Sequence, residues 1–169
     1  MSTRALYTFR DNDGSYNVYK HHDGYPTGAA IAILNALTLA WVLPRYEADE
    51  FAAGFVAANK LPVWCDTQIL EGIQKENMQI SVECPYKGMR SLAGGGIRLM
   101  SSGIPQDIAP CDIEFRYEIY PGNADGEVRV KAFETNYWDD EKKERLLFDC
   151  EISKIQEVAQ KHQDEAEEE

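Results

Sequence analysis

Residues 28–43 lie in the longest uncharged stretch of the chain, and this stretch limits the folds that the chain can adopt. Only Asn35 and Thr38 are polar among these sixteen residues. The segment is shorter than the roughly 20 residues that a membrane-spanning helix needs, and no basic flank marks a cytoplasmic side. We therefore expect no membrane association. Instead, the segment predicts a central helix that neighbouring elements cover on most sides.

The residues that border this segment indicate where the helix begins and ends. Thr27 is expected to cap its N-terminus, because a threonine hydroxyl can accept a hydrogen bond from the free amides of the first turn. Pro44 is expected to end the helix. A second helix is predicted over residues 48–59, where Asp49 and Glu50 place negative charge in the first turn.

The N-terminal residues have the pattern of a β-hairpin. Residues 4–10 and 16–21 are rich in aromatic and β-branched types and flank the turn residues 11–15. This turn contains Asp13-Gly14, a strong hairpin signal because glycine accepts the positive φ of tight turns. After the two helices, residues 67–77 fit a third, short helix and residues 79–84 alternate as a strand.

The last third of the chain alternates between apolar and polar residues, as antiparallel strands with one wet face do. Strands are predicted at 97–101, 112–120, 127–137 and 145–152, with a register shift near Phe133 and a helix over 153–163. In the strand 112–120, the residues expected to share the inner face are Ile113, Phe115, Tyr117 and Ile119.

These elements predict an α+β fold with an N-terminal β-hairpin, two to three helices and a C-terminal antiparallel meander. The strands are expected in one sheet with the helices on one face. Residues 1–163 are predicted to form a single domain. Residues 164–169 carry five carboxylates, which repel one another, and predict an acidic flexible tail.

The overall charge of −12 argues against non-specific nucleic-acid binding, which needs a basic surface. It suits a soluble protein or one with a basic partner. None of the cysteines at 65, 84, 111 and 150 forms a Cys-x-x-Cys pair, so a zinc ribbon or redox pair is not expected. The first residues lack a secretory apolar stretch, and we expect a cytoplasmic protein with reduced thiols.

The densest chemistry lies in the segment Lys20-His21-His22-Asp23, shortly before Tyr25. Histidine suits acid–base catalysis at neutral pH. Neighbouring strand residues point to opposite faces, so the two histidines can share a metal only if the backbone turns between them. Zinc would also need further ligands, and we assign no metal and no cofactor. The simpler interpretation is a hairpin end whose polar side chains cap the following helix and bond the loop.

A second group of residues suggests an anionic ligand. Arg90 and Arg98 flank residues 94–96, three glycines whose bare amides could form an anion nest. No Gly-Lys-Ser/Thr follows them, so the phosphate-binding motifs are absent. The predicted ligand-binding residues are Lys20, His21, His22, Asp23, Tyr25, Arg90 and Arg98.

The segment 18–26 resembles a group of small uncharacterised proteins from bacteria and their phages that share a VYKHxDGYP-like string. The likeness extends to residues 44–51 and 94–99 and covers roughly the first hundred residues. The resemblance implies a bacterial or phage setting and assigns no catalytic residue. Accessory proteins that block host factors are common in this setting.

The sequence therefore favours a non-catalytic binding protein, a phage or prophage accessory factor that inhibits or sequesters a host component. Its partner would be a host protein or a small anionic ligand. The alternative is a small histidine-dependent hydrolase, with or without a metal, that uses His21, His22 and Asp23. The sequence leaves open whether the helix over residues 28–43 is covered within one chain or shared in a homo-oligomer.

Overall fold

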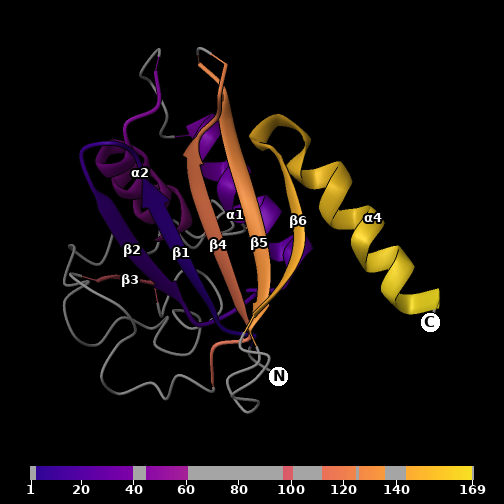
Figure 1. The fold of residues 1–169 in the computed structure, drawn as a ribbon. Coiled ribbons are helices and arrows are strands. Elements are labelled where there is room, and N and C mark those ends of the chain that lie inside the picture. The colour runs from indigo at the N-terminus through magenta and orange to yellow at the C-terminus, as the bar shows by residue number, and fades with distance from the viewer. Residues whose placement is uncertain are drawn as a thin grey trace, which may run out of the picture.

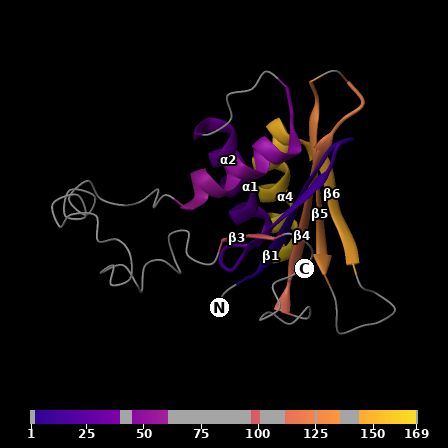
Figure 2. The same ribbon diagram turned by 90° about the vertical axis from the view of Figure 1, so that its left-hand side faces the viewer.

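A computed structural model describes residues 3–39, 45–60, 97–100, 112–124, 126–135 and 144–168. In these ranges, three helices cover one face of a six-stranded mixed sheet with strand order β3-β2-β1-β4-β5-β6 (Figures 1 and 2). This arrangement confirms the predicted α+β class. In chain order the elements are β1 (Ala5–Arg10), β2 (Ser15–Lys20), α1 (Pro26–Leu39), α2 (Ala48–Lys60), β3 (Arg98–Met100), β4 (Phe115–Pro121), β5 (Val128–Thr135), β6 (Glu144–Glu151), the 3-10 turn η2 (Ile152–Lys154) and α4 (Ile155–Glu168).

The N-terminal hairpin and the C-terminal meander join through one parallel pair, β1 with β4. Tyr7 lies opposite Tyr117 in this pairing, whereas every other strand pair in the described sheet is antiparallel. The two segments are about a hundred residues apart in the sequence. A parallel pair needs a long connection of this kind, because a tight turn can join only antiparallel strands.

The core lies between the sheet and the helices. From β1, Phe9 packs on Phe51 and Phe55 of α2, with ring centroids 5.7 and 5.3 Å apart. In α1, the core residues are small or β-branched, which lets this helix approach the sheet closely. The most buried are Ala29, Ala30, Ala32, Ile33 and Ala36. The prediction of a buried central helix is therefore confirmed over Pro26–Leu39, and its expected end at Pro44 lies outside the described ranges.

The start of α1 differs from the expected cap. The helix begins at Pro26, a residue whose fixed φ suits the first helical position, and the Ala29 amide donates to the Tyr25 carbonyl at 2.9 Å. Thr27 thus lies inside the first turn. Its hydroxyl donates to Gln163 of α4 at 2.9 Å, so it connects two helices instead of capping one.

Asp11 closes the hairpin turn and also caps α2. Its Oδ1 accepts from the amides of Asp13 and Gly14, each at 2.9 Å, and its Oδ2 accepts from the Ala48 amide at 2.8 Å. Among the described glycines only Gly126 has a positive φ, so Gly14 does not supply the conformation that we expected of it. The hairpin was predicted correctly, but its turn is closed by the Asp11 side chain and by the bond from the Asp11 amide to the Gly14 carbonyl at 3.1 Å, without a positive φ at Gly14.

The C-terminal strands follow the predicted alternation except at two places, Leu147–Phe148 and Ile113. A register shift falls between Ala132 and Phe133, as the sequence indicated. In β6, Leu147 and Phe148 are neighbours, which point to opposite faces in a regular strand, yet both pack against the main core. Ile113 does not share the inner face of β4: it precedes the strand and packs with Leu6 on the opposite side of the sheet.

The last helix, α4, is longer than predicted. It packs beside α1 through the buried Ile155 and Ala159, and the ring of His162 lies 6.3 Å from that of Phe148. It continues to Glu168 and so includes most of the acidic run. The mobility of this run stays a prediction. None of the helices in the described ranges has the length and apolar character needed to cross a bilayer.

Several predictions fall on residues outside the described ranges. These are the helix over residues 67–77, the strand over residues 79–84, the glycines at 94–96 and the cysteines at 65, 84 and 111. Cys150 is described: it is a free, buried thiol whose pKa burial raises to about 11. A thiol with a raised pKa is a poor nucleophile at neutral pH.

Replacing Asp11 by alanine is expected to lower the free energy of unfolding by about 1–2 kcal/mol, the usual cost of losing an N-cap. Asp13→Ala serves as the matched control, because the Asp13 side chain is exposed on the same turn. Urea unfolding followed by circular dichroism measures both values. Equal effects of the two substitutions would contradict the capping role.

Acid should remove this stabilisation. The pKa of Asp11 is lowered, mainly by the hydrogen bond from the Ala48 amide. A carboxylate with a lowered folded-state pKa stabilises fully above its ordinary pKa of about 4 and loses that contribution as the pH falls through the lowered value. The stability difference between the wild type and Asp11→Ala should therefore shrink below about pH 4. A stability difference between the two proteins that stays constant down to about pH 2 would contradict the role assigned to the Asp11 carboxylate.

Candidate functional site

The loop from Lys20 to Tyr25 connects β2 to α1 and lies against the start of β1. The Gly24 amide donates to the Thr3 carbonyl at 2.9 Å, and the Tyr117 hydroxyl donates to the Gly24 carbonyl at 2.8 Å. A Cβ on Gly24 would lie 2.7 Å from the Cβ of Ala5, so only glycine fits there without a shift. Asp23, with a φ of 53°, turns the chain just before this contact.

Lys20 folds back over the loop. Its Nζ donates to the carbonyl of His22 and lies 3.4 Å from the carbonyl oxygen of Asp23. Burial lowers the pKa of Lys20, and the charge of Asp23 partly opposes this. The ammonium therefore satisfies loop carbonyls, which is the structural role that the sequence also suggested.

The two histidines come together because β2 ends at Lys20 and the chain turns. Their ring centroids are 4.7 Å apart in an edge-to-face arrangement, and the Tyr19 hydroxyl lies 2.6 Å from Nδ1 of His21. In an extended strand, the side chains of His21 and His22 would instead have pointed to opposite faces. No group of three or more His, Cys, Asp or Glu side chains in the described ranges is placed to hold a metal ion.

Two buried nitrogens near this loop have no hydrogen-bond partner among the described residues. They are Nε2 of His22 and Nε of Arg4, whose Nη1 forms an ion pair with Asp112 at 3.3 Å. The pKa of His22 is lowered, first by burial, and the charge of Arg4 contributes in the same direction. His22 therefore favours the neutral form at physiological pH.

Beneath the loop, the rings of Tyr7 and Tyr117 stack with centroids 5.1 Å apart and 24° between their planes. Both side chains are fully buried, and burial raises the pKa of each hydroxyl. The two hydroxyls differ in bonding: Tyr117 holds Gly24, whereas the hydroxyl of Tyr7 has no partner in the part of the chain that is described.

The structure brings together most of the predicted ligand-binding residues, but not all of them. Lys20, His21, His22 and Asp23 share one loop, followed by Tyr25, which is 42% exposed. The backbone of Arg98 lies on β3 opposite Tyr19, one strand from this loop, and residue 90 lies outside the described ranges. Sequence reasoning missed three residues that support or border the loop, namely Arg4, Tyr7 and Tyr117.

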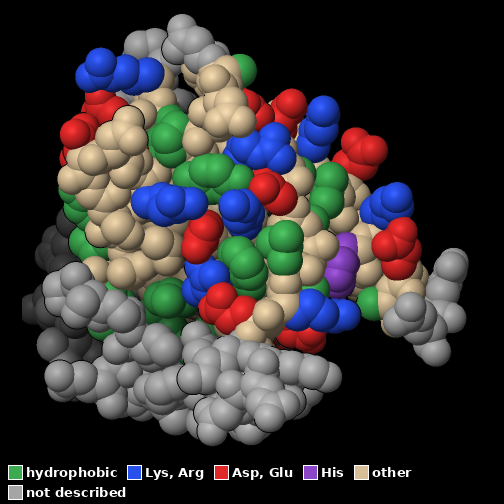
Figure 3. Space-filling view, in the orientation of Figure 1, with side chains coloured by type: hydrophobic (Ala, Val, Ile, Leu, Met, Phe, Trp, Pro, Cys, Tyr) green, Lys and Arg blue, Asp and Glu red, His purple; other side chains and the backbone are tan. Residues whose placement is uncertain are grey.

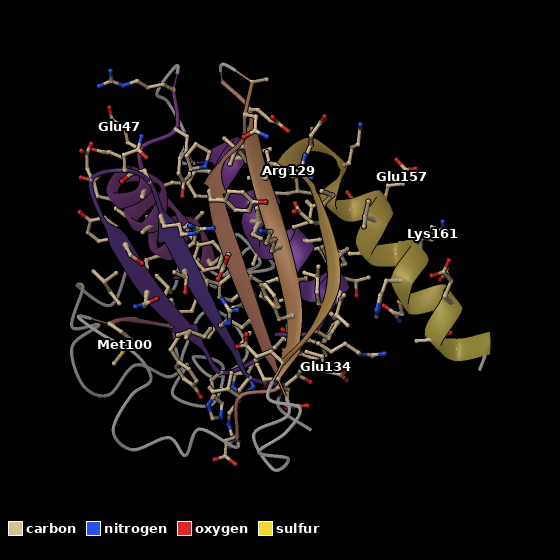
Figure 4. The ribbon with its side chains drawn as sticks, viewed as in Figure 1. Glu47, Met100, Arg129, Glu134, Glu157 and Lys161 are labelled. Carbon is tan, nitrogen blue, oxygen red and sulfur yellow. The ribbon has the colours of Figure 1, made fainter. Side chains whose placement is uncertain are left out.

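A second surface with distinct chemistry is the open face of the sheet, which is opposite the helices (Figure 3). Basic and acidic side chains alternate over the central strands there, with aromatic rings between them. Arg129 marks this face along β5 in Figure 4. The ion-paired groups are the cations Arg10, Arg116, Arg129 and Lys131 and the carboxylates Glu118, Glu127, Glu144 and Asp149.

Two aromatic rings on this face lie beside cations. The Tyr120 ring lies between Arg10 and Lys131, whose charged ends are 5.0 and 4.9 Å from its centroid. The guanidinium of Arg116 lies 4.1 Å from the centre of the Phe133 ring. We call these five residues the cation–aromatic patch.

Only part of this patch could be predicted from the sequence. Alternation placed Arg116 and Glu118 on the outer face of their strand, as the structure has them. It could not bring Arg10 next to Tyr120, because that contact depends on the parallel pairing of β1 with β4.

No protein-family model matches the chain, and neither a curated protein nor a solved structure matches it. The functional interpretation therefore depends on the chemistry of the loop and of the open face.

The two stacked tyrosines allow a matched test of how the loop is held. Tyr117→Phe removes the donor to Gly24 and should lower the free energy of unfolding by about 1–2 kcal/mol, because a buried carbonyl loses its partner. Tyr7→Phe should cost much less, since its hydroxyl has no described partner. Urea unfolding of both variants measures the difference, and equal costs would contradict the assigned hydrogen bond.

Proposed function

We propose that this protein is a non-catalytic binding protein that contacts a protein partner through the cation–aromatic patch. The observation that carries this proposal is the placement of Tyr120 between Arg10 and Lys131 on an uncovered sheet face. Tyrosine and arginine are among the residue types that dominate binding energy at protein interfaces. Tyrosine offers a large, rigid contact area at a low cost in conformational entropy.

The rigidity of the patch supports a preformed binding surface. Its members project from β1, β4 and β5, three adjacent strands of one sheet. Arg116 is fixed further by Glu144, which receives its Nε and Nη2 at 2.7 and 2.6 Å. The Tyr120 hydroxyl lies 3.0 Å from both carboxylate oxygens of Asp149. Side chains that are held before binding lose less entropy on association.

The electrostatics of the open face favour a particular kind of partner. Its four ion-paired cations and four carboxylates cancel, so the net charge of −12 lies on the rest of the chain. A strongly charged ligand would have to break these pairs. A protein surface with mixed charges and exposed apolar groups would not, and it matches the composition of ordinary interfaces.

The loop 20–25 supports the same preference. The Lys20 ammonium bonds loop carbonyls, and Nε2 of His22 forms no hydrogen bond to a hydroxyl or thiol of the described residues. A hydrolase needs a nucleophile, a base and a group that stabilises the anion around one point. This geometry lends the histidine-dependent hydrolase less support than the binding protein.

The resemblance of residues 18–26 to proteins of bacteria and phages indicates where to look for the partner. In such a setting, a small acidic protein that covers a functional surface of a bacterial host protein would inhibit or sequester it. The partner is therefore sought in the bacterial cytoplasm, and a phage or prophage origin is part of the proposal.

Tyr120→Ala should weaken partner capture about 30-fold, because a truncated interface hot spot costs about 2 kcal/mol. The tagged protein is incubated with a bacterial lysate, and captured proteins are quantified by mass spectrometry. Lys161→Ala is the control, because Lys161 projects from α4, away from the sheet (Figure 4).

A photo-reactive residue in place of Tyr120 should crosslink to the same captured protein. Circular dichroism checks that each variant is folded. Capture that is unchanged in Tyr120→Ala, together with no crosslink from this position, would contradict the proposed surface.

A small anion at Arg4 and His22 is a second candidate, favoured by their unpartnered buried nitrogens. Both can present N–H donors, which oxyanions accept. Inorganic phosphate should then raise the pKa of His22 in an NMR titration, because an anion stabilises the imidazolium. The His162 ring, on α4, is the internal control. An unchanged His22 titration at saturating phosphate would remove this candidate.

A further inference from the structure

A pocket of about 460 Å³ opens between the segment before α2 and the turn that joins β4 to β5. Both segments lie at the same end of the sheet (Figures 1 and 2). The first contributes Arg45 and Tyr46 to the lining, and the turn contributes Pro121, Ala124 and Glu127 among others. The volume falls within the roughly 300–1,000 Å³ of typical ligand pockets, so one large side chain fits inside.

Tyr46 gives the pocket a fixed aromatic wall. Its hydroxyl donates to the Ile119 carbonyl at 2.9 Å, and its ring centroid lies 5.7 Å from that of Phe51. The ring is thus held by a hydrogen bond at its tip and by a second ring beside it. Pro121, an exposed residue at the end of β4, adds another apolar ring to the lining. Two fixed rings favour an occupant that stacks on them.

The β4–β5 turn is shaped before any ligand arrives. The Glu127 carboxylate accepts from the Ala124 amide at 3.1 Å, and the Glu127 carbonyl accepts from the Gly122 amide at 2.8 Å. Gly126 has a φ of 76°, which favours glycine, and a Cβ built there would meet no atom within 4 Å. This side of the pocket therefore stays open, and binding costs little ordering of the turn.

The charges of the lining are already paired. Arg45 donates from Nε to Glu47 at 2.7 Å, and Glu127 accepts from Nη1 of Arg129 at 2.9 Å. A charged occupant would compete with these pairs, whereas a neutral one would leave them intact. An aromatic ring also gains a contact with the guanidinium of Arg45, whose side chain is 79% exposed and free to lie over a bound ring.

We propose that this pocket receives an aromatic side chain of the protein partner that contacts the cation–aromatic patch. The inference rests on the proposed function and adds the chemical class of the group that anchors the partner. Tyr120 of the patch directly precedes Pro121 and lies opposite Arg129, which holds Glu127. A partner that covers Tyr120 therefore reaches the pocket by extending over the end of the sheet. Aromatic residues seated in pockets commonly dominate the binding energy of an interface.

An NMR titration of the full chain with N-acetyl-phenylalaninamide tests the pocket without the partner. The backbone amides of Gly122, Asn123 and Gly126 should shift, with a dissociation constant of about 1 mM for a ligand of this size. N-acetyl-argininamide should bind roughly tenfold more weakly, because it would have to compete with the ion pairs of the lining. Shifts confined to residues outside the lining, or equal binding of the two compounds, would overturn the proposal.

Two variants separate the pocket from the rest of the surface. Ala124→Trp should weaken binding of N-acetyl-phenylalaninamide roughly tenfold, because the new ring occupies the pocket. Arg45→Ala should weaken it about threefold, the usual effect of losing an exposed cation–ring contact. Gln160→Trp is the matched control, because it adds the same ring at an exposed position of α4. Circular dichroism checks that each variant is folded, and unchanged binding to Ala124→Trp and Arg45→Ala would overturn the proposal.

Crosslinking connects the pocket to the partner. A photo-reactive residue in place of Asn123, an exposed lining residue, should crosslink to the same protein as one in place of Tyr120. A crosslink from position 120 without one from position 123 would overturn the pocket assignment and leave the proposed function standing. Crosslinks from neither position would overturn both.

Discussion

The parallel pairing of β1 with β4 is the contact on which the rest of the structure depends. It places Tyr7 beside Tyr117 in the core and lets the Tyr117 hydroxyl hold the Gly24 carbonyl. On the other face it places Arg10 next to Tyr120. A single strand pair therefore fixes the core, the loop before α1 and the proposed binding surface.

The alternation of side chains along β4 assigns opposite tasks to residues that are close in sequence. Tyr117 and Ile119 face the helices and are fully buried, whereas Arg116, Glu118 and Tyr120 face the open side. Because the strand period is two, the inner residues can be packed tightly while the outer ones keep their polar chemistry. Core packing thus holds the outer residues in place without taking part in binding.

The sequence predicted features that depend on local patterns. The hairpin, the two helices after it and the alternating C-terminal strands follow from periodicity and turn residues. It also suggested that the polar side chains of residues 20–25 bond the loop, as Lys20 does. The contacts of Ile113 with Leu6 and of Arg10 with Tyr120 join distant segments, and no periodicity in one sequence encodes such a pairing.

The double role of Asp11 links two elements that the chain order separates. One carboxylate oxygen holds the hairpin turn, and the other holds the first amide of α2. Fraying of the first turn of α2 therefore loosens the tip of the hairpin, and the reverse also holds. Regions joined in this way open as one cooperative unit, so their amide protons should exchange with solvent at matched rates although more than thirty residues lie between them.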